Sequence, residues 1–526
     1  MASNFLDNIP SASPSSFDFA LLAFAAGFIV RPFGALVFGR LGDLIGRKYT
    51  FLLTLVLMGG STFAIGLVPG FATIGWAAPI LVLILRLVQG LALGGEYGGA
   101  ATYVAEHAPA NRRGFWTSWI QTTATLGLFL ALGVIILIRS NQGVEAFSAE
   151  WGGWRYPFWM SIILVVVSIL IRMKMSESPM FTKLKSEGKT STNPLKESFG
   201  QKANFKMVLL ALFGAVMGQG VIWYTGQFYA QSFIETVCKV EFVQSRNLML
   251  WAILFATPFF VVFGYLSDRI GRKWIMMFGM LAGIVTYRPI YQYFLDATNA
   301  KNRTEKIDLA NTKASEKLAS VDSKVCTKLY VVQKIDTAYT DGAKFSYTKT
   351  DTLFLTDIIK DANTGSIYYM QPNAMDATKF DTIVVQLKPV KGAILDATKT
   401  QEVTIATASL KPNIVVEKTL DPTTYWNLIW LVFVQILYVT MVYGPIAAFL
   451  VELFPTKIRY TSMSLPYHIG NGWFGGLLPT ISFALVAQNG NIYYGLWYPI
   501  AIAAMTFVIG MLFVRETKDV DIYAND

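Results

Sequence analysis

One charged decamer occurs twice in this chain, as GRLGDLIGRK at residues 39–48 and as GYLSDRIGRK at residues 264–273. In each copy an Asp precedes an Arg by four residues, a spacing that allows an ion pair on a helix. The Asp can instead meet the positive end of a neighbouring helix. A basic turn alone would explain one copy, whereas two matching copies predict a conformational latch that stabilises one state and releases another. Its members would be Gly39, Gly42, Asp43, Gly46, Arg47, Lys48, Gly264, Asp268, Gly271, Arg272 and Lys273.

Polar side chains also interrupt the apolar segments in the first half of the chain. Arg31 lies eight residues before the first decamer, and Arg86 and Gln89 stand three residues apart, on one face of a helix. Glu96 stands between two pairs of glycines, which predict tight packing against a neighbouring helix. Two interpretations stay open for these groups. The arginines contact an anionic substrate or form structural ion pairs, and Glu96 carries a proton or pairs with an arginine.

The second half of the chain carries a polar and aromatic stripe in GQGVIWYTGQFYAQ at residues 218–231. Its helical spacing favours a wet cavity over a lipid-facing surface, with interhelical hydrogen bonding alone as the other explanation. His468 is one of two histidines, and it is either a titrating group or a packing residue. The second-half candidates for the substrate or proton pathway are Gln219, Tyr224, Gln227, Gln435, Tyr438, His468 and Asn471.

Long apolar segments must position these residues. Of the 526 residues, 53% are hydrophobic and 15% are charged, against about 25% charged in a soluble protein. A helix needs about 20 apolar residues to cross a bilayer, and only helices or closed barrels satisfy the backbone in lipid. The apolar runs are too long for barrel strands, so we predict an all-α polytopic membrane protein. Its eleven helices would be residues 17–39, 50–69, 77–104, 115–138, 156–172, 206–234, 248–266, 274–295, 424–450, 461–487 and 492–514.

The formal net charge of +10 gathers in particular short loops. Because lysines and arginines follow the odd-numbered runs, the positive-inside rule places the ends of those runs in the cytoplasm. The charge therefore indicates membrane topology and not a nucleic-acid partner. Met1, Cys238 and Cys326 then lie outside, where a disulfide is allowed, although two lone cysteines are more often unpaired. We expect a multi-pass protein of the cytoplasmic (inner) membrane, embedded in the lipid bilayer.

The two decamers mark equivalent points of two halves. In the second half, two runs precede the decamer and four follow it, whereas in the first half one run precedes it and four follow. The first half is therefore one helix short. Parallel repeats are a known plan of transporters. We expect two six-helix halves whose first helix is missing, either lost or encoded upstream of Met1.

Both decamers resemble the loop motif of the major facilitator superfamily. The stretches RLVQGLALGGEYGGAATYVAEHAPANRRGFW (86–116), GGWRYPFW (152–159), SESPMF (176–181) and VELFPTKIRYTSMSLPYHIGNGWFGGLLP (451–479) resemble its metabolite:proton symporter family. The resemblance covers nearly all of residues 17–515 apart from one insertion, and it places the helix of Arg86 beside the central cavity. Members usually begin with a helix that carries a Glu-Trp-Tyr-Asp-Phe-like stretch, which this sequence does not contain.

This resemblance implies a secondary transporter that moves a small metabolite together with protons by alternating access. The substrates known for the family are organic acids and zwitterionic osmolytes. A planar guanidinium grips a carboxylate with two hydrogen bonds, so the arginines favour an organic acid. An uncoupled facilitator and an osmolyte transporter are alternatives, and a solute sensor is an alternative of another class. No nucleophile–base pair, phosphate loop or metal-ligand set stands out, so we expect no enzyme, catalytic residue, metal or cofactor, with the proton gradient as the energy source.

An insertion at residues 296–423 interrupts the second half and is too polar to span a membrane. Residues 299–320 predict a polar helix or linker, and the short β-branched stretches after them predict a small, partly β domain. Topology places this domain outside, in the periplasm of a Gram-negative cell, with an unknown partner. The predicted order is an extracytoplasmic segment (1–16), the N-terminal helical half of five helices (17–172), a cytoplasmic loop (173–205), the C-terminal half (206–295 and 424–514) around the inserted domain (296–423), and a cytoplasmic tail (515–526).

Overall fold

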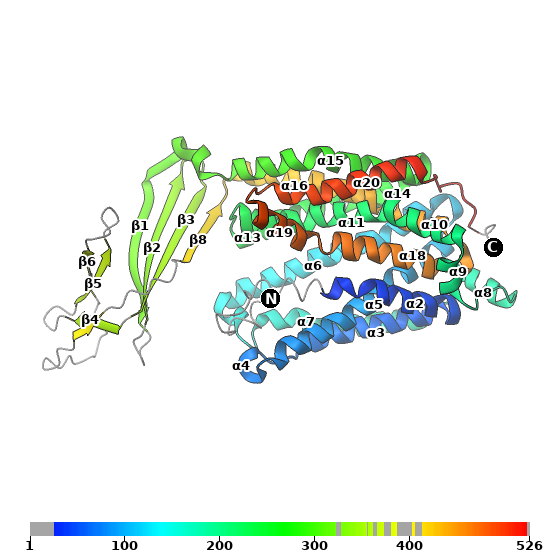
Figure 1. The fold of residues 1–526 in the computed structure, drawn as a ribbon, viewed down its shortest axis with the longest axis horizontal. Helices are drawn as coiled ribbons and strands as arrows, with labels where there is room; N and C mark the ends of the chain where they lie inside the picture. Colours follow the sequence, from blue (N-terminus) through cyan, green and yellow to red (C-terminus); the bar gives the residue numbers. More distant parts are fainter. Residues whose placement is uncertain are drawn as a thin grey trace. The chain divides into compact units, whose positions relative to one another are not determined.

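The computed structural model describes residues 26–321, 328–354, 356–360, 366–372, 380–386, 402–404 and 413–522. It divides into two compact units. The first, which we call the helical body, comprises Met1–Val237, Ser245–Leu295 and Tyr425–Asp526. The second, the inserted unit, comprises Cys238–Gln244 and Asp296–Thr424. Figure 1 shows long helices in the helical body and strands in the inserted unit.

The N-terminal half of the helical body is built from long helices joined by short turns. Pro32 stands in the first turn of the first complete helix, where its fixed φ favours a helix start. The helices are α2 (Arg31–Ile45), α3 (Arg47–Ile65), α4 (Phe71–Ile74), α5 (Ala77–His107), α6 (Arg113–Ser148) and α7 (Tyr156–Lys174). Two short helices, α8 (Pro179–Ser186) and α9 (Pro194–Gly200), form the connection to the other half.

The C-terminal half begins with a continuous helical rod over Lys202–Val237. Three π-helical turns, at Leu212–Val216, Thr225–Tyr229 and Phe233–Val237, separate its helices α10 (Lys202–Ala211), α11 (Met217–Tyr224) and α12 (Ala230–Ser232). Another π-helical turn, Ile469–Gly475, follows α18. The remaining helices are α13 (Phe242–Ala256), α14 (Pro258–Ile270), α15 (Arg272–Ala297), α16 (Pro422–Tyr443), α17 (Ile446–Leu453), α18 (Arg459–His468), α19 (Leu478–Asn489) and α20 (Trp497–Phe513).

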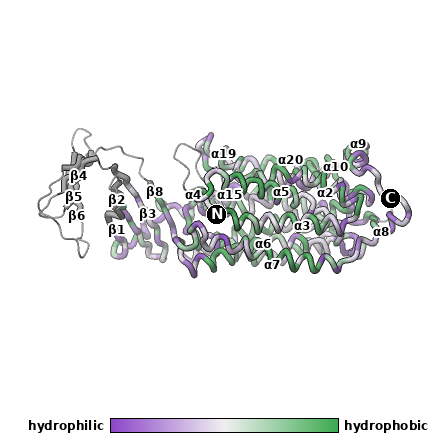
Figure 2. The backbone as a smooth tube through the Cα atoms, turned by 90° about the horizontal axis from the view of Figure 1, so that it is seen from below, coloured by the Kyte–Doolittle hydropathy of each residue, from purple (hydrophilic) through white to green (hydrophobic). Residues whose placement is uncertain are grey.

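Among the described residues, nine helical segments are long and apolar enough to cross a membrane. Helices α2 and α15 occupy two further apolar runs of the sequence. The outside of the body is covered by large apolar side chains, such as Leu164, Leu130 and Phe513, which are 68%, 63% and 66% exposed. Figure 2 shows hydrophobic residues along the helices and hydrophilic residues at the end where α8 and α9 lie. An apolar surface of this extent fits lipid better than water.

The predicted helices leave residues 40–49 and 267–273 as connections, and these bounds are wrong. Residues 39–45 continue α2, and residues 264–270 continue α14. In each copy a single glycine separates the two helices. Gly46, with φ 119°, lies between α2 and α3, and Gly271, with φ 121°, lies between α14 and α15. Residues that carry a side chain rarely adopt a positive φ of this size. Glycine is therefore the residue that allows one helix to follow the other after a single residue. The latch is therefore mounted on helix ends and not on a mobile loop.

Helices from the two halves cross closely at one end of the body. Helix α2 packs against α18, and α14 packs against α6 (Figure 1). The ring of Tyr460 on α18 fills space that Gly42, Gly98 and Gly99 leave open, and its hydroxyl donates to the Gly95 carbonyl. Tyr460 is fully buried. The glycine pairs around Glu96 thus serve close packing, because a β-carbon at these positions would collide with the tyrosine or with α2.

The inserted unit contains two antiparallel sheets. The first has the strand order β1 (Ile307–Val321), β2 (Lys328–Tyr339), β3 (Lys344–Phe354) and β8 (Asn413–Thr419). The second has the order β6 (Phe380–Gln386), β5 (Ser366–Pro372), β4 (Thr356–Lys360) and β7 (Glu402–Thr404). The predicted polar helix or linker at 299–320 is wrong: one 3-10 segment, Ala300–Lys306, leads directly into β1. Pairing with the β-branched strand β2, from Ile307 opposite Tyr339 to Val321 opposite Leu329, overrides the helical propensity of this polar stretch.

Arg303 joins the two ends of the inserted unit. Its guanidinium binds the carboxylate of Asp421, and a second nitrogen lies 3.1 Å from Asp341. The Thr424 hydroxyl accepts another hydrogen bond from it at 2.9 Å. Although burial raises the pKa of Asp421, hydrogen bonds from Thr424 and Arg303 outweigh it and hold that pKa below its usual value. Cys238 is buried in the same unit, and burial raises the pKa of its thiol to about 12. Cys326 lies outside the described residues.

We expect replacement of Arg303 by leucine to destabilise the inserted unit by about 3–5 kcal/mol, because it leaves the buried Asp421 carboxylate without its cation. The measurement is protease cleavage within residues 296–424 of the full chain at increasing urea concentration. Lys306→Leu is the matched control, since its amine lies 3.4 Å from Asp341 but its side chain is 56% exposed. Its cost should stay near about 0.5 kcal/mol. Equal cleavage of the two variants would contradict the role given to Arg303.

Candidate transport site

A cavity of about 760 Å³ lies between the two halves of the helical body. That volume is in the range of sites for small organic molecules. Helices α2, α3, α5, α6 and α7 of the N-terminal half line it with Arg31, Phe51, Leu93, Glu96, Tyr97, Ala100, Trp119, Ile120, Gln121, Thr123, Ala124 and Arg172, and Phe28 lies just before α2. The C-terminal half adds Trp223, Tyr224, Phe228, Tyr443, Tyr467, His468 and Asn471.

The N-terminal wall of the cavity carries its formal charges. The guanidinium carbon of Arg31 lies 3.8 Å from the centre of the Phe28 ring, and its Nε has no hydrogen-bond partner among the described residues. Arg172 on α7 places Nη2 at 3.2 Å from Oε1 of Glu96 on α5. The two side chains of this pair are 12% and 21% exposed. The wall thus offers one guanidinium with hydrogen-bonding capacity left over and one ion pair that a ligand or a proton can open.

The C-terminal wall is aromatic and polar. The hydroxyls of Tyr443 and Tyr467 lie 2.7 Å apart. The Tyr467 ring stacks on Tyr97 of the other half, with ring centres 3.5 Å apart and planes within 4°. Gln121 donates a hydrogen bond to the Tyr97 hydroxyl at 2.7 Å. Aromatic faces attract cations, and the hydroxyls bind polar groups, so this wall suits a small polar solute.

Five of the predicted pathway residues line this cavity: Arg31, Glu96, Tyr224, His468 and Asn471. The structure brings them together from α2, α5, α11, α18 and the π-helical turn after α18. The two interpretations left open for Glu96 were that it carries a proton or that it pairs with an arginine. The structure shows the pairing and also places Glu96 at the cavity, so it leaves proton transfer by Glu96 open. Arg31 stands at the first turn of α2, close to the opposite half, since a β-carbon on Gly472 would lie 3.8 Å from its stem.

The other predicted pathway residues are not among the cavity-lining side chains. Gln89 accepts from Arg86 at 3.4 Å and donates to Thr62 at 2.8 Å, which makes a polar contact within the N-terminal half. The helix of Arg86 does border the cavity about two to four turns further along, from Leu93 to Ala100. Elsewhere, Gln219 accepts from Asn471 at 2.9 Å, the Tyr438 hydroxyl accepts from Thr286 at 3.2 Å, and Gln227 and Gln435 are buried.

The first decamer forms a charge network with the opposite half. Asp43 accepts from the backbone N–H of Thr461 at 2.9 Å and from its hydroxyl at 2.7 Å, at the first turn of α18. Of the two arrangements open for this Asp, contact with a neighbouring helix end is the one observed. Arg47 binds Glu106 of α5, and Arg459 of α18 binds the same carboxylate at 2.9 Å. We call this set the Glu106 network.

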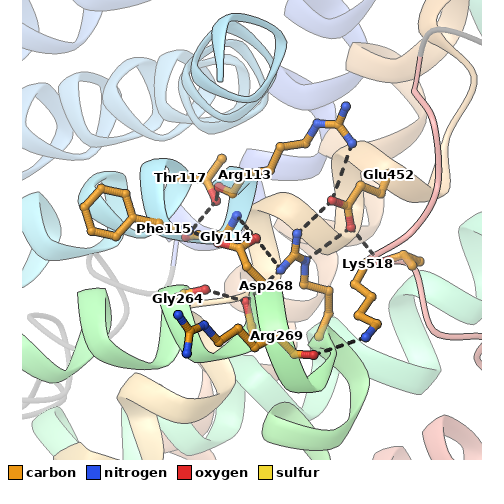
Figure 3. Close-up of polar contacts among 12 residues, drawn as sticks. Arg113, Gly114, Phe115, Thr117, Gly264, Asp268, Arg269, Glu452 and Lys518 are labelled. Carbon is orange, nitrogen blue, oxygen red and sulfur yellow. Dashed lines mark hydrogen bonds and ion pairs between the residues drawn. The ribbon is translucent and has the colours of Figure 1, made fainter. Parts of the chain in front are cut away.

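The second decamer repeats this arrangement with the halves exchanged (Figure 3). Asp268 accepts from the backbone N–H groups of Gly114 and Phe115, both at 2.8 Å, at the first turn of α6. It also forms an ion pair with Arg272 at 2.6 Å. This is the pair between residues four apart that the sequence allowed. Arg272 binds Glu452 of α17 at 3.0 Å, and Arg113 of the N-terminal half lies 3.8 Å from that carboxylate. We call this set the Glu452 network.

A further carboxylate closes each decamer at the start of the next helix. Glu177 accepts from the backbone N–H groups of Arg47 and Lys48, both at 3.2 Å, at the N-terminus of α3. Glu516 does the same for Arg272 and Lys273 at 2.8 and 3.0 Å, at the N-terminus of α15. Negative charge is favourable at helix N-termini, so these contacts hold the Gly-Arg-Lys corners in place.

Sequence analysis missed the partners of the latch: Glu106, Arg113, Glu177, Glu452, Arg459, Tyr460, Thr461 and Glu516. A signal for four of them was present. The pattern Glu-x-x-Pro-x-x-x-Arg occurs at residues 106–113 and again at residues 452–459. Matching positions in two halves mark these residues in the same way that the repeated decamers mark the first set.

The family model of the Major Facilitator Superfamily matches residues 2–298. The chain belongs to this superfamily. Its fold is similar to that of the proton:xylose symporter XylE bound to 6-bromo-6-deoxy-D-glucose, with a TM-score of 0.60 at 14% identity over 99% of this chain and 92% of that one. Curated relatives of the chain are named as transporters, and nine described segments of the chain are long and apolar enough to cross a membrane.

Three bacterial relatives are similar to the chain in sequence. The chain is 36% identical to a proline/betaine transporter of Salmonella typhimurium, over 52% of this chain and 56% of the relative. It is 36% identical to the inner membrane metabolite transport protein YhjE of Escherichia coli, over 50% and 60%. It is 35% identical to the alpha-ketoglutarate permease of Escherichia coli, over 50% and 59%. The chain thus matches a little over half the length of these relatives.

Proposed function

We propose that this chain carries a small metabolite with a carboxylate group across the cytoplasmic membrane, coupled to protons, by alternating access. The observation that supports this proposal best is the presence of the Glu106 and Glu452 networks. Both join the two halves at one end of the helical body, and both halves line the cavity. The networks stabilise one arrangement of the halves and leave the cavity between them. Breaking them would let the halves separate at that end. Arg31 is the group proposed to bind the carboxylate, since two guanidinium nitrogens fit two carboxylate oxygens.

Proton coupling is proposed to reside in the Glu96–Arg172 pair. A proton on Glu96 neutralises the carboxylate and removes the attraction at 3.2 Å, which releases Arg172. The freed guanidinium then faces the cavity as a second cation for the substrate carboxylate. Release of the solute returns Arg172 to Glu96, and the proton leaves. One proton and one carboxylate would travel together in each cycle, so the net charge of the cavity would be the same with and without the solute.

Glu96→Gln should therefore abolish uptake driven by a pH gradient while solute exchange continues, because glutamine mimics a permanently protonated Glu96. The measurement is external alkalinisation of weakly buffered cells that express the chain, after pulses of organic acids and osmolytes, together with exchange in proteoliposomes. We expect a solute-specific pH rise for the unmodified chain and none for Glu96→Gln. Asp43→Asn, which weakens the latch, should lose both signals. A pH rise that persists in Glu96→Gln would contradict this role for Glu96.

Solute uptake without any pH change would favour the uncoupled facilitator. A zwitterionic osmolyte is the second candidate solute, and the aromatic wall formed by Trp223, Tyr224, Phe228, Tyr443 and Tyr467 is the observation that favours it, because aromatic faces attract ammonium groups. The similarity to a proline/betaine transporter supports this alternative. Binding of a solute without net flux would favour the sensor, which belongs to another functional class.

We also propose the orientation of the chain. The networks lie at the end of the body near α8 and α9, where hydrophilic residues gather (Figure 2), and the positive-inside rule assigns that end to the cytoplasm. The inserted unit, between α15 and α16, would then lie on the outer or periplasmic side, where it could contact a solute or a partner. We propose that all eleven apolar runs of the sequence are membrane spans.

A further inference from the structure

His468 is a buried polar residue that the transport cycle proposed above does not use. Its side chain ends α18, borders the cavity and is 2% exposed. Neither Nδ1 nor Nε2 has a hydrogen-bond partner among the described residues. A buried polar group without a partner costs about 1–3 kcal/mol, so such groups are rare and need an explanation. In its neutral form the imidazole carries one donor and one acceptor.

A second unpartnered group stands on the same wall. The indole Nε1 of Trp223 is buried and has no hydrogen-bond partner in the described part of the chain. By contrast, the amide nitrogen of Asn471, one turn after His468, already donates to Gln219 at 2.9 Å and to the Tyr467 carbonyl at 3.2 Å. The wall therefore combines satisfied polar groups that hold it rigid with two groups left for a ligand.

Arg31 borders the same part of the cavity from the opposite half. Its stem lies against the π-helical turn that follows His468, since a β-carbon on Gly472 would be 3.8 Å from the Arg31 Cβ and Cδ. Arg31 is also a charged neighbour of the imidazole. One small molecule can thus reach a guanidinium on one half and an imidazole on the other.

We infer, as an extension of the proposed function, that the solute is a 2-hydroxy- or 2-amino-carboxylate, with its carboxylate on Arg31 and its O–H or N–H group on His468. The donor on the second carbon satisfies the imidazole acceptor, and the solute oxygen or the carboxylate accepts from Trp223. A plain carboxylate and a quaternary betaine have no such donor. When either of them binds, the acceptor nitrogen of His468 would stay buried without a hydrogen bond. A site built to form a hydrogen bond with its solute rejects analogues that lack the donor.

The test compares lactate with propionate, and proline with N,N-dimethylproline, by equilibrium binding to the purified full chain in lipid nanodiscs. We expect the unmodified chain to bind the member with the donor about 10- to 100-fold more tightly. In His468→Leu that preference should vanish, because binding of lactate and proline falls while binding of propionate changes by about twofold or less. His468→Asn keeps a donor and an acceptor and should retain part of the preference.

The other histidine supplies the matched control. His107 donates a hydrogen bond from Nδ1 to the Tyr103 carbonyl and is not a cavity-lining residue, so His107→Leu should leave all four affinities unchanged. Equal binding of lactate and propionate by the unmodified chain would overturn the inference and leave the proposed function standing. So would a loss in His468→Leu that is the same for both acids. Binding of none of the four solutes would overturn the inference together with the proposed carboxylate site.

Discussion

Glu106→Gln is expected to open the latch end of the protein. Glu106 is buried and binds Arg47 and Arg459, which come from different halves. Without its charge, two buried guanidinium groups lose their shared carboxylate, and breaking a buried ion pair costs about 3–5 kcal/mol. Separation of the halves relieves part of this cost. A share of about 2.8 kcal/mol would shift the ratio of closed to open protein about 100-fold toward the open state.

The shift can be measured as thiol accessibility. Ser462 is fully buried in α18 and contacts Ser198. A cysteine at this position, in a chain with Cys238 and Cys326 replaced by serine, should react faster with an impermeant thiol reagent when Glu106→Gln is present. Glu187→Gln is the matched control. Glu187 pairs with Lys189 on the surface of the segment that connects the two halves, between α8 and α9. Equal reaction rates in Glu106→Gln and the parent would show that the network does not hold the closed state.

Arg31→Gln is expected to weaken binding of a carboxylate solute by about 10- to 150-fold, the effect of losing a hydrogen bond to a charged group. The two-pronged geometry of the guanidinium contributes to carboxylate binding in addition to its charge. The affinity of Arg31→Lys for the solute should therefore lie between those of the parent and Arg31→Gln. Competition against a bound carboxylate in nanodiscs measures both variants. The unfilled Nε of Arg31 and its position in the cavity wall are the reasons for this expectation.

Arg86 provides the contrast for this experiment. From the sequence, both Arg31 and Arg86 were candidates for contact with an anion, and the family resemblance favoured Arg86 because it places that helix beside the central cavity. The structure places Arg86 outside the lining of the cavity and against Gln89. Arg86→Gln should therefore keep near-normal affinity. A loss as large as that of Arg31→Gln would mean that the solute also reaches Arg86.

Much of the fold could be predicted from the sequence because its signals are local or repeated. Apolar runs of about 20 residues predict membrane helices on their own, and the two decamers together with the longer motifs led to the superfamily, which the family model confirms. Local turn chemistry was less visible. The decamers look like loops because they are charged, yet Asp43 and Asp268 are stabilised on helices by contacts with α18 and α6.

The candidate site was harder to predict because its groups meet across the chain. Glu106 and Arg459 are 353 residues apart in sequence, and Asp43 and Thr461 are 418 apart. No helical spacing relates such residues. The polar stripe at 218–231 shows the same limit: its residues share a helix, but packing sends Tyr224 to the cavity and buries Gln219 against Asn471. The inserted unit adds strand pairings, and these depend on partners that a single segment does not reveal.

The exchange of partners between the halves has a consequence in terms of symmetry. In the contact of α2 with α18 and of α14 with α6, each half presents an aspartate to the first turn of a helix in the other, and each supplies an arginine to the other's glutamate. Two identical subunits would make the same contact across a two-fold axis, as an isologous dimer interface. Here one chain forms it with itself. The two copies can therefore diverge separately, and a substitution in one decamer alters one half of a two-fold contact and leaves the sequence of the other half unchanged.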